Sequence, residues 1–600
     1  MRRAAARSLR TSLQCTVRGL SRTSRRGSIV SPVSAAGARH LSSTSSHNSP
    51  VRPRPDHALL GDPLKSSMYY RRASAALVSA LVGYGAYNYY GGNGTESQQA
   101  SISRAYSSGK PTGDDVPLRP VLIIGADEIA TGTFAGEGPI SKTTDEDGRR
   151  VLEMLTPEQA TQKLRKSEQS YFVNRGKGVI RYDLDQLPSN DPIEDDHAEK
   201  IVEVPSKSEQ GNDDWMFWGV FDGHSGWTTS AKLRQTLINY VARELNDTYM
   251  ASQGLMPPSS AIDSAIKNGF IKLDDEICHQ SVQKVLQSNN RIVGAELLAP
   301  AISGSCALLS FYDTRTQTLR VACTGDSRAV LGRRSESGKW TATRLSQDQT
   351  GSNPDEAARL RKQHPGEEYV VRNGRVLGGL EPTRAFGDAT YKWSREVSNQ
   401  LRAKFFGKTQ SALVKTPPYV TAEPVVTTTK IEPDKGDFVV MATDGLWEML
   451  TDEEVVGLVG KWIETQKGVS SNSQFDAAWA KVFGPKKGSN ALPVEAAKGG
   501  HGQDGGKTPI RVEQWGSGKD GDRFVVEDKN AATHLIRNAL GGKNQEQVQA
   551  LLTLPAPSSR RWRDDLTVQV IFFGYGEKTG EVVLNKEASA SAKPAVQAKL

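Results

Sequence analysis

Residues 215–226 read WMFWGVFDGHSG, a run of apolar residues that ends in an aspartate followed by a glycine. A short run rich in aromatic and β-branched residues is typical of a buried β-strand. The pattern returns in FVVMATDG (438–445), and in DDLTVQVIFF (564–573) two aspartates come before the strand instead. The sequence therefore indicates a fold in which buried strands deliver carboxylates to one rim.

Further strands and helices are predicted around these stretches. The other strand-like runs lie at 306–312, 319–323, 328–331 and 437–443, and hairpin turns such as 313–318 join several of them. Helical patterns cover 228–249, 261–287 and 453–466, and a capping-box pattern at 156–159 opens a helix that runs to about 167. Hairpins combined with separate helices favour an α+β fold of antiparallel sheets over a parallel doubly wound fold.

The net charge of +8 comes from the first part of the chain. Residues 1–95 hold fourteen basic and two acidic residues, so the remaining chain holds 62 basic and 66 acidic ones. An acidic body gives no support to nucleic-acid binding. The four cysteines form no CxxC pair, which argues against a disulfide scaffold or a zinc module.

Both ends of the chain carry targeting patterns. Residues 1–46 are rich in Arg and Ser and lack acidic residues, which is the composition of a mitochondrial transit peptide. Residues 73–95 hold no charge and are long enough for a single inner-membrane anchor that leaves the body in the intermembrane space. The C-terminal Ala598-Lys599-Leu600 is a close variant of the peroxisomal address Ser-Lys-Leu and predicts dual targeting.

The composition between these ends divides the chain further. Residues 96–154 are expected to form a linker, residues 155–576 one folded domain and residues 577–600 a flexible tail. The Gly- and Lys-rich residues 484–522 are expected to be a mobile insertion within that domain.

Acidic residues at strand ends carry the chemistry. They are Asp222, Asp326, Asp444, Asp564 and the pair Glu194–Asp195, which precedes a strand expected near Lys200. Carboxylates without His or Cys clusters favour Mg²⁺ or Mn²⁺, and two such ions can activate a water for attack on a phosphoryl group. Gly223 lets its own backbone carbonyl approach a metal, and His224 is placed to protonate a leaving alkoxide.

Other hydrolytic and nucleotide-binding motifs are missing from the sequence. Cys323 and Arg328 are separated by four residues, whereas the loop of a cysteine phosphatase needs five. The chain has no GxxxxGK[ST] loop and no GxSxG elbow. A metal-dependent phosphoryl hydrolase is the interpretation that remains.

Six motifs resemble, in order, those of the metal-dependent protein phosphatase family, type 2C. They are DGHSG (222–226), GSCALL (304–309), TGDSRAVL (324–331), PTRAFGD (382–388), ATDGLWE (442–448) and RDDLTV (563–568). The resemblance implies a four-layer α-β-β-α sandwich of two antiparallel sheets flanked by helices. It also implies two Mn²⁺ or Mg²⁺ ions and the hydrolysis of phosphoserine and phosphothreonine in proteins.

The resemblance also assigns the principal metal ligands. Asp222 bridges both ions and acts as a catalytic residue, and the carbonyl of Gly223 binds one of the ions. Asp444 and Asp564 bind the other ion.

The remaining roles follow from the same motifs. Glu194 and Asp195 act through metal-bound waters, Asp326 helps to hold a weaker third metal, and His224 is the general acid. One position departs from the family pattern, because Asn190 stands where many members carry a phosphate-binding arginine. The metals and another basic group, which the sequence does not identify, are then expected to orient the phosphate.

Several stretches resemble pyruvate dehydrogenase phosphatase catalytic subunits in particular. They are QLPSNDPIEDDHA (186–198), EDKNAATHLIRNALGG (527–542) and LTPEQATQKL (155–164). This subgroup implies the pyruvate dehydrogenase complex of the mitochondrial matrix as the phosphoprotein partner, which conflicts with an anchor at 73–95 that faces the intermembrane space. The alternatives are a catalytically inactive binding module on the same fold and a two-metal phosphodiesterase or nuclease.

Overall fold

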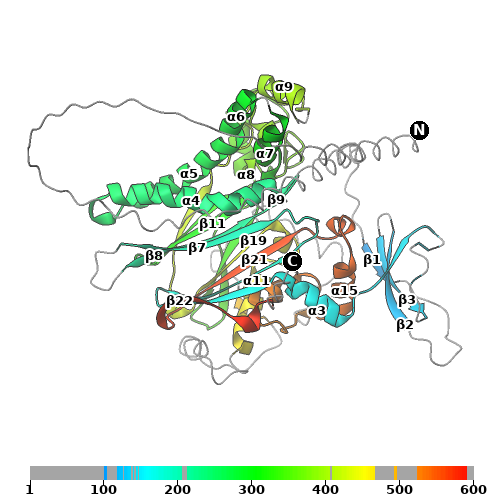
Figure 1. The fold of residues 1–600 in the computed structure, drawn as a ribbon. Helices are drawn as coiled ribbons and strands as arrows, with labels where there is room; N and C mark the ends of the chain where they lie inside the picture. Colours follow the sequence, from blue (N-terminus) through cyan, green and yellow to red (C-terminus); the bar gives the residue numbers. More distant parts are fainter. Residues whose placement is uncertain are drawn as a thin grey trace, which may run out of the picture. The chain divides into compact units, whose positions relative to one another are not determined.

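The computed structural model describes residues 101–104, 118–125, 128–136, 140, 144–145, 147–205, 212–288, 290–405, 409–466, 492–495 and 523–590. The chain divides into two units, residues 1–66 and 67–600, and all described residues belong to the second unit. Two antiparallel sheets form the centre of this unit, with helices on their outer faces (Figure 1).

The first sheet has five strands in the order β18-β12-β11-β8-β7, and every neighbouring pair is antiparallel. The strands are β7 (Asp196–Val204), β8 (Asp213–Phe221), β11 (Ala307–Asp313), β12 (Thr318–Thr324) and β18 (Val425–Lys430). The predicted hairpin is present, because Asp313 at the end of β11 pairs with Thr318 at the start of β12.

The second sheet has eight strands in the order β20-β14-β13-β19-β21-β6-β5-β22. The strands are β5 (Gln169–Arg175), β6 (Val179–Leu187), β13 (Arg328–Arg334), β14 (Trp340–Arg344), β19 (Phe438–Ala442), β20 (Val494–Glu495), β21 (Leu566–Phe573) and β22 (Lys578–Leu584). All neighbouring pairs are antiparallel except β14 and β20, which are parallel.

Alternation along β8 shows how the layers are built. Met216 and Trp218 pack into the core between the two sheets, whereas Trp215 and Phe217 pack into the core beneath the helices. Because successive side chains of a strand point to opposite faces, one apolar run serves both cores. The strand is buried on both sides, which explains why its sequence shows no polar alternation.

Helices cover the outer faces of both sheets. α4 (Thr228–Ala251) and α5 (Ser259–Asp275) pack on the first sheet, and α11 (Asp452–Gln466) and α14 (Ala531–Ala539) pack on the second (Figure 1). The expected helix at 156–167 is confirmed as α3 (Pro157–Leu164) and a following 3-10 turn, with the capping box at Thr156 formed. The four-layer α-β-β-α sandwich is therefore confirmed.

Two of the expected boundaries are wrong. Residues 118–153 are not a linker, since β2 (Leu118–Ile124), β3 (Glu128–Ala135) and β4 (Arg150–Glu153) form a sheet with β1 (Ser101–Arg104). The apolar Leu122 and Ile129 of this sheet are fully buried in the core that also contains Leu164 of α3. Likewise, the tail expected from 577 begins with β22, which pairs with β5.

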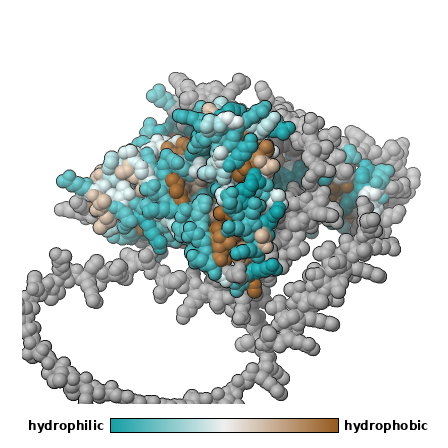
Figure 2. All heavy atoms as spheres, turned by 90° about the horizontal axis from the view of Figure 1, so that it is seen from above, coloured by the Kyte–Doolittle hydropathy of each residue, from teal (hydrophilic) through white to brown (hydrophobic). Residues whose placement is uncertain are grey.

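Other expected segments lie outside the described residues. These are the transit peptide at 1–46, the anchor at 73–95, the insertion at 484–522 apart from 492–495, and the C-terminal targeting motif. Among the described residues, no helix combines the length and hydrophobicity that crossing a membrane requires. On the face of the molecule that Figure 2 shows, the surface of the described residues is mostly hydrophilic, and the hydrophobic residues form small separate groups.

A buried pair of carboxyl groups joins β6 to α14. Thr533 Oγ1 lies 2.8 Å from Asp185 Oδ2 and 2.9 Å from Glu168 Oε2. A hydroxyl has one hydrogen and can donate to only one of these carboxyl groups, so the other must be protonated to donate in return. Burial, and then the charge of Glu168, raise the pKa of Asp185 well above its usual range, and burial also raises the pKa of Glu168.

We expect Asp185→Asn to stabilise the protein more at pH 8 than at pH 5. A folded-state pKa above the unfolded value gives stability that is complete below the unfolded pKa and is lost as pH rises through the folded pKa. The asparagine amide can donate to Thr533 Oγ1 at every pH, so the gain at pH 8 should be about 1 kcal/mol. Melting temperatures at both pH values test this, with the exposed Asp247→Asn as the control. If Asp185→Asn lost the same stability at both pH values, the interpretation that Asp185 or Glu168 is protonated in the folded protein would be contradicted.

Candidate metal centre

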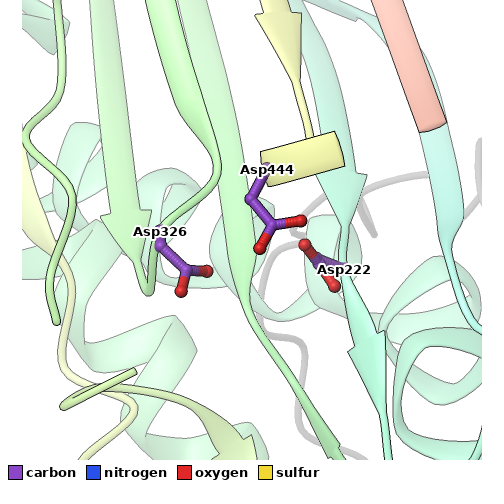
Figure 3. Close-up of side chains that lie close together, drawn as sticks. All are labelled: Asp222, Asp326 and Asp444. Atoms are coloured by element: carbon purple, nitrogen blue, oxygen red, sulfur yellow. The ribbon is translucent and has the colours of Figure 1, made fainter. Parts of the chain in front are cut away.

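Three aspartates from different elements meet at one end of the sandwich. Asp222 follows β8, Asp326 lies in the turn between β12 and β13, and Asp444 is the first residue of α10 (Asp444–Trp447), directly after β19. One carboxylate oxygen from each lies within 4.8 Å of the others (Figure 3). The fold thus brings together three aspartates that are far apart in the sequence and that lie at or near strand ends.

The donor set fits divalent cations. Oδ1 of Asp444 is buried and has no hydrogen-bond partner among the residues that the structure describes. Burial, and then the charge of Asp326, raise the pKa of Asp444 to about 6, while burial and Asp444 raise the pKa of Asp222 well above its usual range. A partly buried group of mutually repelling carboxylates with an unpartnered oxygen is a site where Mg²⁺ or Mn²⁺ would replace the missing partners.

Asp195 and Asp564 adjoin this cluster. Oδ2 of Asp195 accepts hydrogen bonds from Thr443 Oγ1 at 2.8 Å and Thr567 Oγ1 at 2.7 Å, which fix the carboxylate beside the ends of β19 and β21. Burial, and then Asp444, raise the pKa of Asp564 to about 7. Both Asp195 and Asp564 also contribute to the raised pKa of Asp222, so they lie within the same electrostatic site.

Glu194 lies at the edge of the same site. Burial, and then the charge of Asp565, raise the pKa of Glu194 to about 7. Its carbonyl oxygen would lie 2.0 Å from a Cβ placed on Gly223. The glycine after Asp222 is therefore required for the close approach of this neighbouring segment. Gly445 has the same role after Asp444, because a Cβ there would lie 2.2 Å from the carbonyl oxygen of Asp565.

Asp565 is a site residue to which the sequence interpretation gave no role, although it named the neighbouring Asp564 as a metal ligand. Its carboxylate accepts hydrogen bonds from the backbone nitrogens of Ser189, Asn190 and Glu194 and from the side-chain amide of Asn190. It thereby fixes the loop that precedes β7 against the start of β21. Consecutive residues at a strand start point in opposite directions, which is the signal that could have separated the two aspartates.

His224 has a partner that the sequence interpretation missed. β9 (Gly223–His224) pairs with β10 (Gly304–Ser305), which also pairs with β17 (Phe386–Gly387), and Asp388 follows β17 directly. His224 Nε2 lies 2.5 Å from Asp388 Oδ2. Burial alone would lower the pKa of His224, but the carboxylate of Asp388 raises it above the usual histidine value.

Gly304 makes room for this pair. A Cβ at this position would lie 2.1 Å from His224 Nε2 and 2.2 Å from Asp388 Oδ2. Asp388 itself has a φ of 46°, a left-handed conformation that aspartate and asparagine tolerate better than most residues. The motif PTRAFGD therefore supplies the carboxylate of Asp388, and the motif GSCALL supplies the space for it at Gly304.

Known proteins are similar to this chain over most of its length. The family model described as Protein phosphatase 2C matches residues 190–481. The chain is 44% identical over 450 residues to the mitochondrial [pyruvate dehydrogenase [acetyl-transferring]]-phosphatase 1 of Saccharomyces cerevisiae, a match that covers 72% of this chain and 76% of that protein.

Two further relatives are similar over comparable lengths. A protein phosphatase 2C homolog of Schizosaccharomyces pombe is 45% identical, over 70% of this chain and 85% of its own length. The human mitochondrial [pyruvate dehydrogenase [acetyl-transferring]]-phosphatase 1 is 31% identical, over 70% of this chain and 83% of its own length.

Proposed function

We propose that this chain, which belongs to the protein phosphatase 2C family and is a metal-dependent protein serine/threonine phosphatase, acts on the phosphorylated pyruvate dehydrogenase complex of mitochondria. The 44% identity to the yeast pyruvate dehydrogenase phosphatase, which extends over 72% of the chain, carries the substrate assignment. The presence of every predicted carboxylate at the site favours an active enzyme over an inactive binding module on the same fold.

In this proposal the carboxylates hold two Mn²⁺ or Mg²⁺ ions. Asp222 would serve both ions, the carbonyl of Gly223 would help to hold one of them, and Asp444 and Asp564 would hold the other. When bound, the ions supply an activated water and neutralise the charge of the phosphoryl group.

The outer carboxylates complete the proposed ligand set. Glu194 and Asp195 hold water molecules at the edge of the centre, and Asp195 is kept in place by Thr443 and Thr567. Asp326, whose carboxylate lies in the same cluster as that of Asp444, would help to hold a weaker third ion.

His224 is the proposed general acid. Asp388 occupies Nε2, so Nδ1 is the nitrogen that would give its proton to the departing serine or threonine oxygen. A histidine whose pKa is raised by a carboxylate partner suits this task, since an alkoxide is a poor leaving group without a proton.

The proposed location is the mitochondrial matrix, where the pyruvate dehydrogenase complex resides. The Arg- and Ser-rich residues 1–46 and the mitochondrial relatives support import into mitochondria. The anchor at 73–95 and peroxisomal targeting by Ala598-Lys599-Leu600 stay predictions. Protease protection of the tagged protein in mitochondria and mitoplasts distinguishes a matrix enzyme from one exposed to the intermembrane space.

The purified protein should release phosphate from a phosphorylated pyruvate dehydrogenase complex when Mn²⁺ or Mg²⁺ is present. We expect no release in EDTA and slower release from an unrelated phosphoserine protein at the same concentration. Phosphate release from both substrates with either ion is the measurement. No release with either metal would reject the enzyme, whereas equal rates on both substrates would reject only the substrate assignment.

A further inference from the structure

The loop beside the metal centre has an uncharged residue, Asn190, at the position that faces the question of phosphate binding. The backbone nitrogen of Asn190 donates to Asp565 Oδ1 at 3.0 Å, and its side-chain amide nitrogen donates to Asp565 Oδ2 at 3.1 Å. The side-chain amide nitrogen is therefore already engaged, and an asparagine carries no charge. A phosphate dianion at this site would be oriented by a positive group from elsewhere in the chain, in addition to the metal ions that neutralise its charge.

Arg560 lies next to this loop although it is 370 residues away in the sequence. It belongs to the 3-10 turn η7 (Ser558–Arg561), which precedes β21. The hydroxyl of Ser559 in this turn donates to the carbonyl oxygen of Ser189 at 2.6 Å, so the turn is fixed beside the residue that precedes Asn190. The position of Arg560 is thus set by the same loop that carries Asn190.

The guanidinium of Arg560 faces the carboxylates and remains accessible. It forms an ion pair with Asp564, and its side chain is 49% exposed. One ion pair uses only part of a guanidinium that has five N–H donors, so donors remain for a second anion.

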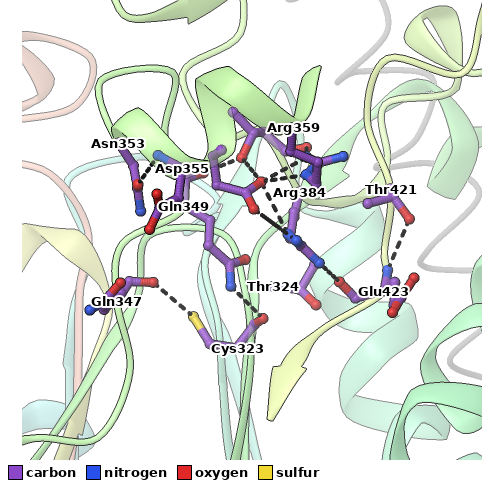
Figure 4. Close-up of polar contacts among 12 residues, drawn as sticks. Cys323, Thr324, Gln347, Gln349, Asn353, Asp355, Arg359, Arg384, Thr421 and Glu423 are labelled. Atoms are coloured by element: carbon purple, nitrogen blue, oxygen red, sulfur yellow. Dashed lines mark hydrogen bonds and ion pairs between the residues drawn. The ribbon is translucent and has the colours of Figure 1, made fainter. Parts of the chain in front are cut away.

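Other arginines near the site are engaged elsewhere. Arg384 of the PTRAFGD motif pairs with Glu356 and donates to the carbonyl oxygen of Glu423 at 2.7 Å (Figure 4). Arg563 is buried and donates to the carbonyl oxygen of Pro188 at 2.8 Å. Both guanidinium groups therefore serve the fold.

We propose that Arg560 binds the phosphoryl oxygens of the substrate and supplies, from the turn before β21, the positive charge that Asn190 does not provide. This inference rests on the proposed phosphatase function. A guanidinium binds phosphate through two parallel N–H donors, which gives orientation as well as charge. Arg560 would then be a substrate-binding residue, and Asp564 would hold it in position between turnovers.

Arg560→Ala should weaken the binding of phosphate without changing the binding of the metal. Loss of charge-assisted hydrogen bonds should raise KM for a phosphopeptide, and Kd for inorganic phosphate by calorimetry, about 10- to 100-fold. Arg560→Lys should recover part of this loss, because a lysine keeps the charge but not the paired donors. Arg561→Ala, in the same turn, is the matched control and should bind phosphate as the wild type does.

The Mn²⁺ concentration for half-maximal activity separates this role from a role in holding Asp564. We expect Arg560→Ala to leave that concentration within about twofold of wild type. An unchanged Kd for phosphate, or a Mn²⁺ requirement that rises as much as KM, would overturn the inference. If the wild type releases no phosphate from phosphopeptides, the proposed function fails, and calorimetry with inorganic phosphate still decides the role of Arg560.

Discussion

Asp222→Asn should abolish metal-dependent phosphatase activity while raising the melting temperature of the metal-free protein. Asparagine keeps the shape of the side chain but cannot bridge two cations, so activity should fall about 10³-fold or more, or about 4 kcal/mol. Without metal, the pKa of Asp222 is raised well above its usual range by burial and by Asp444, Asp195 and Asp564. Asparagine is neutral without taking up a proton, so the variant avoids the cost of protonating Asp222 on folding, about 1 kcal/mol or more.

Two assays measure these opposite effects. Phosphate release is followed at saturating Mn²⁺, and thermal unfolding is followed in EDTA and again with Mn²⁺. The wild type should gain stability from Mn²⁺ and the variant should gain little, because a ligand stabilises only the state that binds it. Asp247→Asn on the exposed face of α4 is the control for the loss of one carboxylate. If the Asp222→Asn variant melted at a lower temperature than the wild type in EDTA, Asp222 would serve mainly as a structural acceptor of hydrogen bonds.

The core strands could be predicted from the sequence because burial on two faces leaves a clear signal. β8, β19 and β21 consist mostly of apolar residues, and each is expected at nearly its observed position. β22 was missed because all seven of its residues are exposed, so it has no apolar face that a pattern could reveal. It is a strand because β5 offers it an unpaired edge, which is a property of the fold and not of the segment.

The site was predictable where function depends on strand ends. Asp222 and Asp444 follow apolar strands, and the structure brings them together with Asp326. The partners of these residues come from distant loops, and no local pattern marks them. Asp388 lies 164 residues from His224, and Arg560 reaches the site through a contact between Ser559 and the loop at Ser189. Such pairs become visible only when the fold has placed the loops.

His224→Gln should slow the release of phosphate from phosphoserine far more than from p-nitrophenyl phosphate. A serine alkoxide needs a proton as it leaves, whereas p-nitrophenolate is stable without one. We therefore expect kcat on a phosphopeptide to fall about 10²- to 10³-fold, and kcat on p-nitrophenyl phosphate to fall less than about tenfold. Glutamine keeps a polar side chain of similar length, which limits the change in packing at β9.

Asp388→Asn tests whether the carboxylate acts through the histidine. Asparagine tolerates the left-handed backbone at this position, where φ is 46°, so the fold should be kept. The amide cannot stabilise a protonated ring as a carboxylate does, so the pKa of His224 should fall and activity on the phosphopeptide should begin to decline at a lower pH. In the double variant with His224→Gln, the loss from Asp388→Asn should disappear, because the two residues act as one unit. Equal losses on both substrates for His224→Gln would show that the histidine orients the phosphate or the metal ligands, and would remove it from the role of general acid.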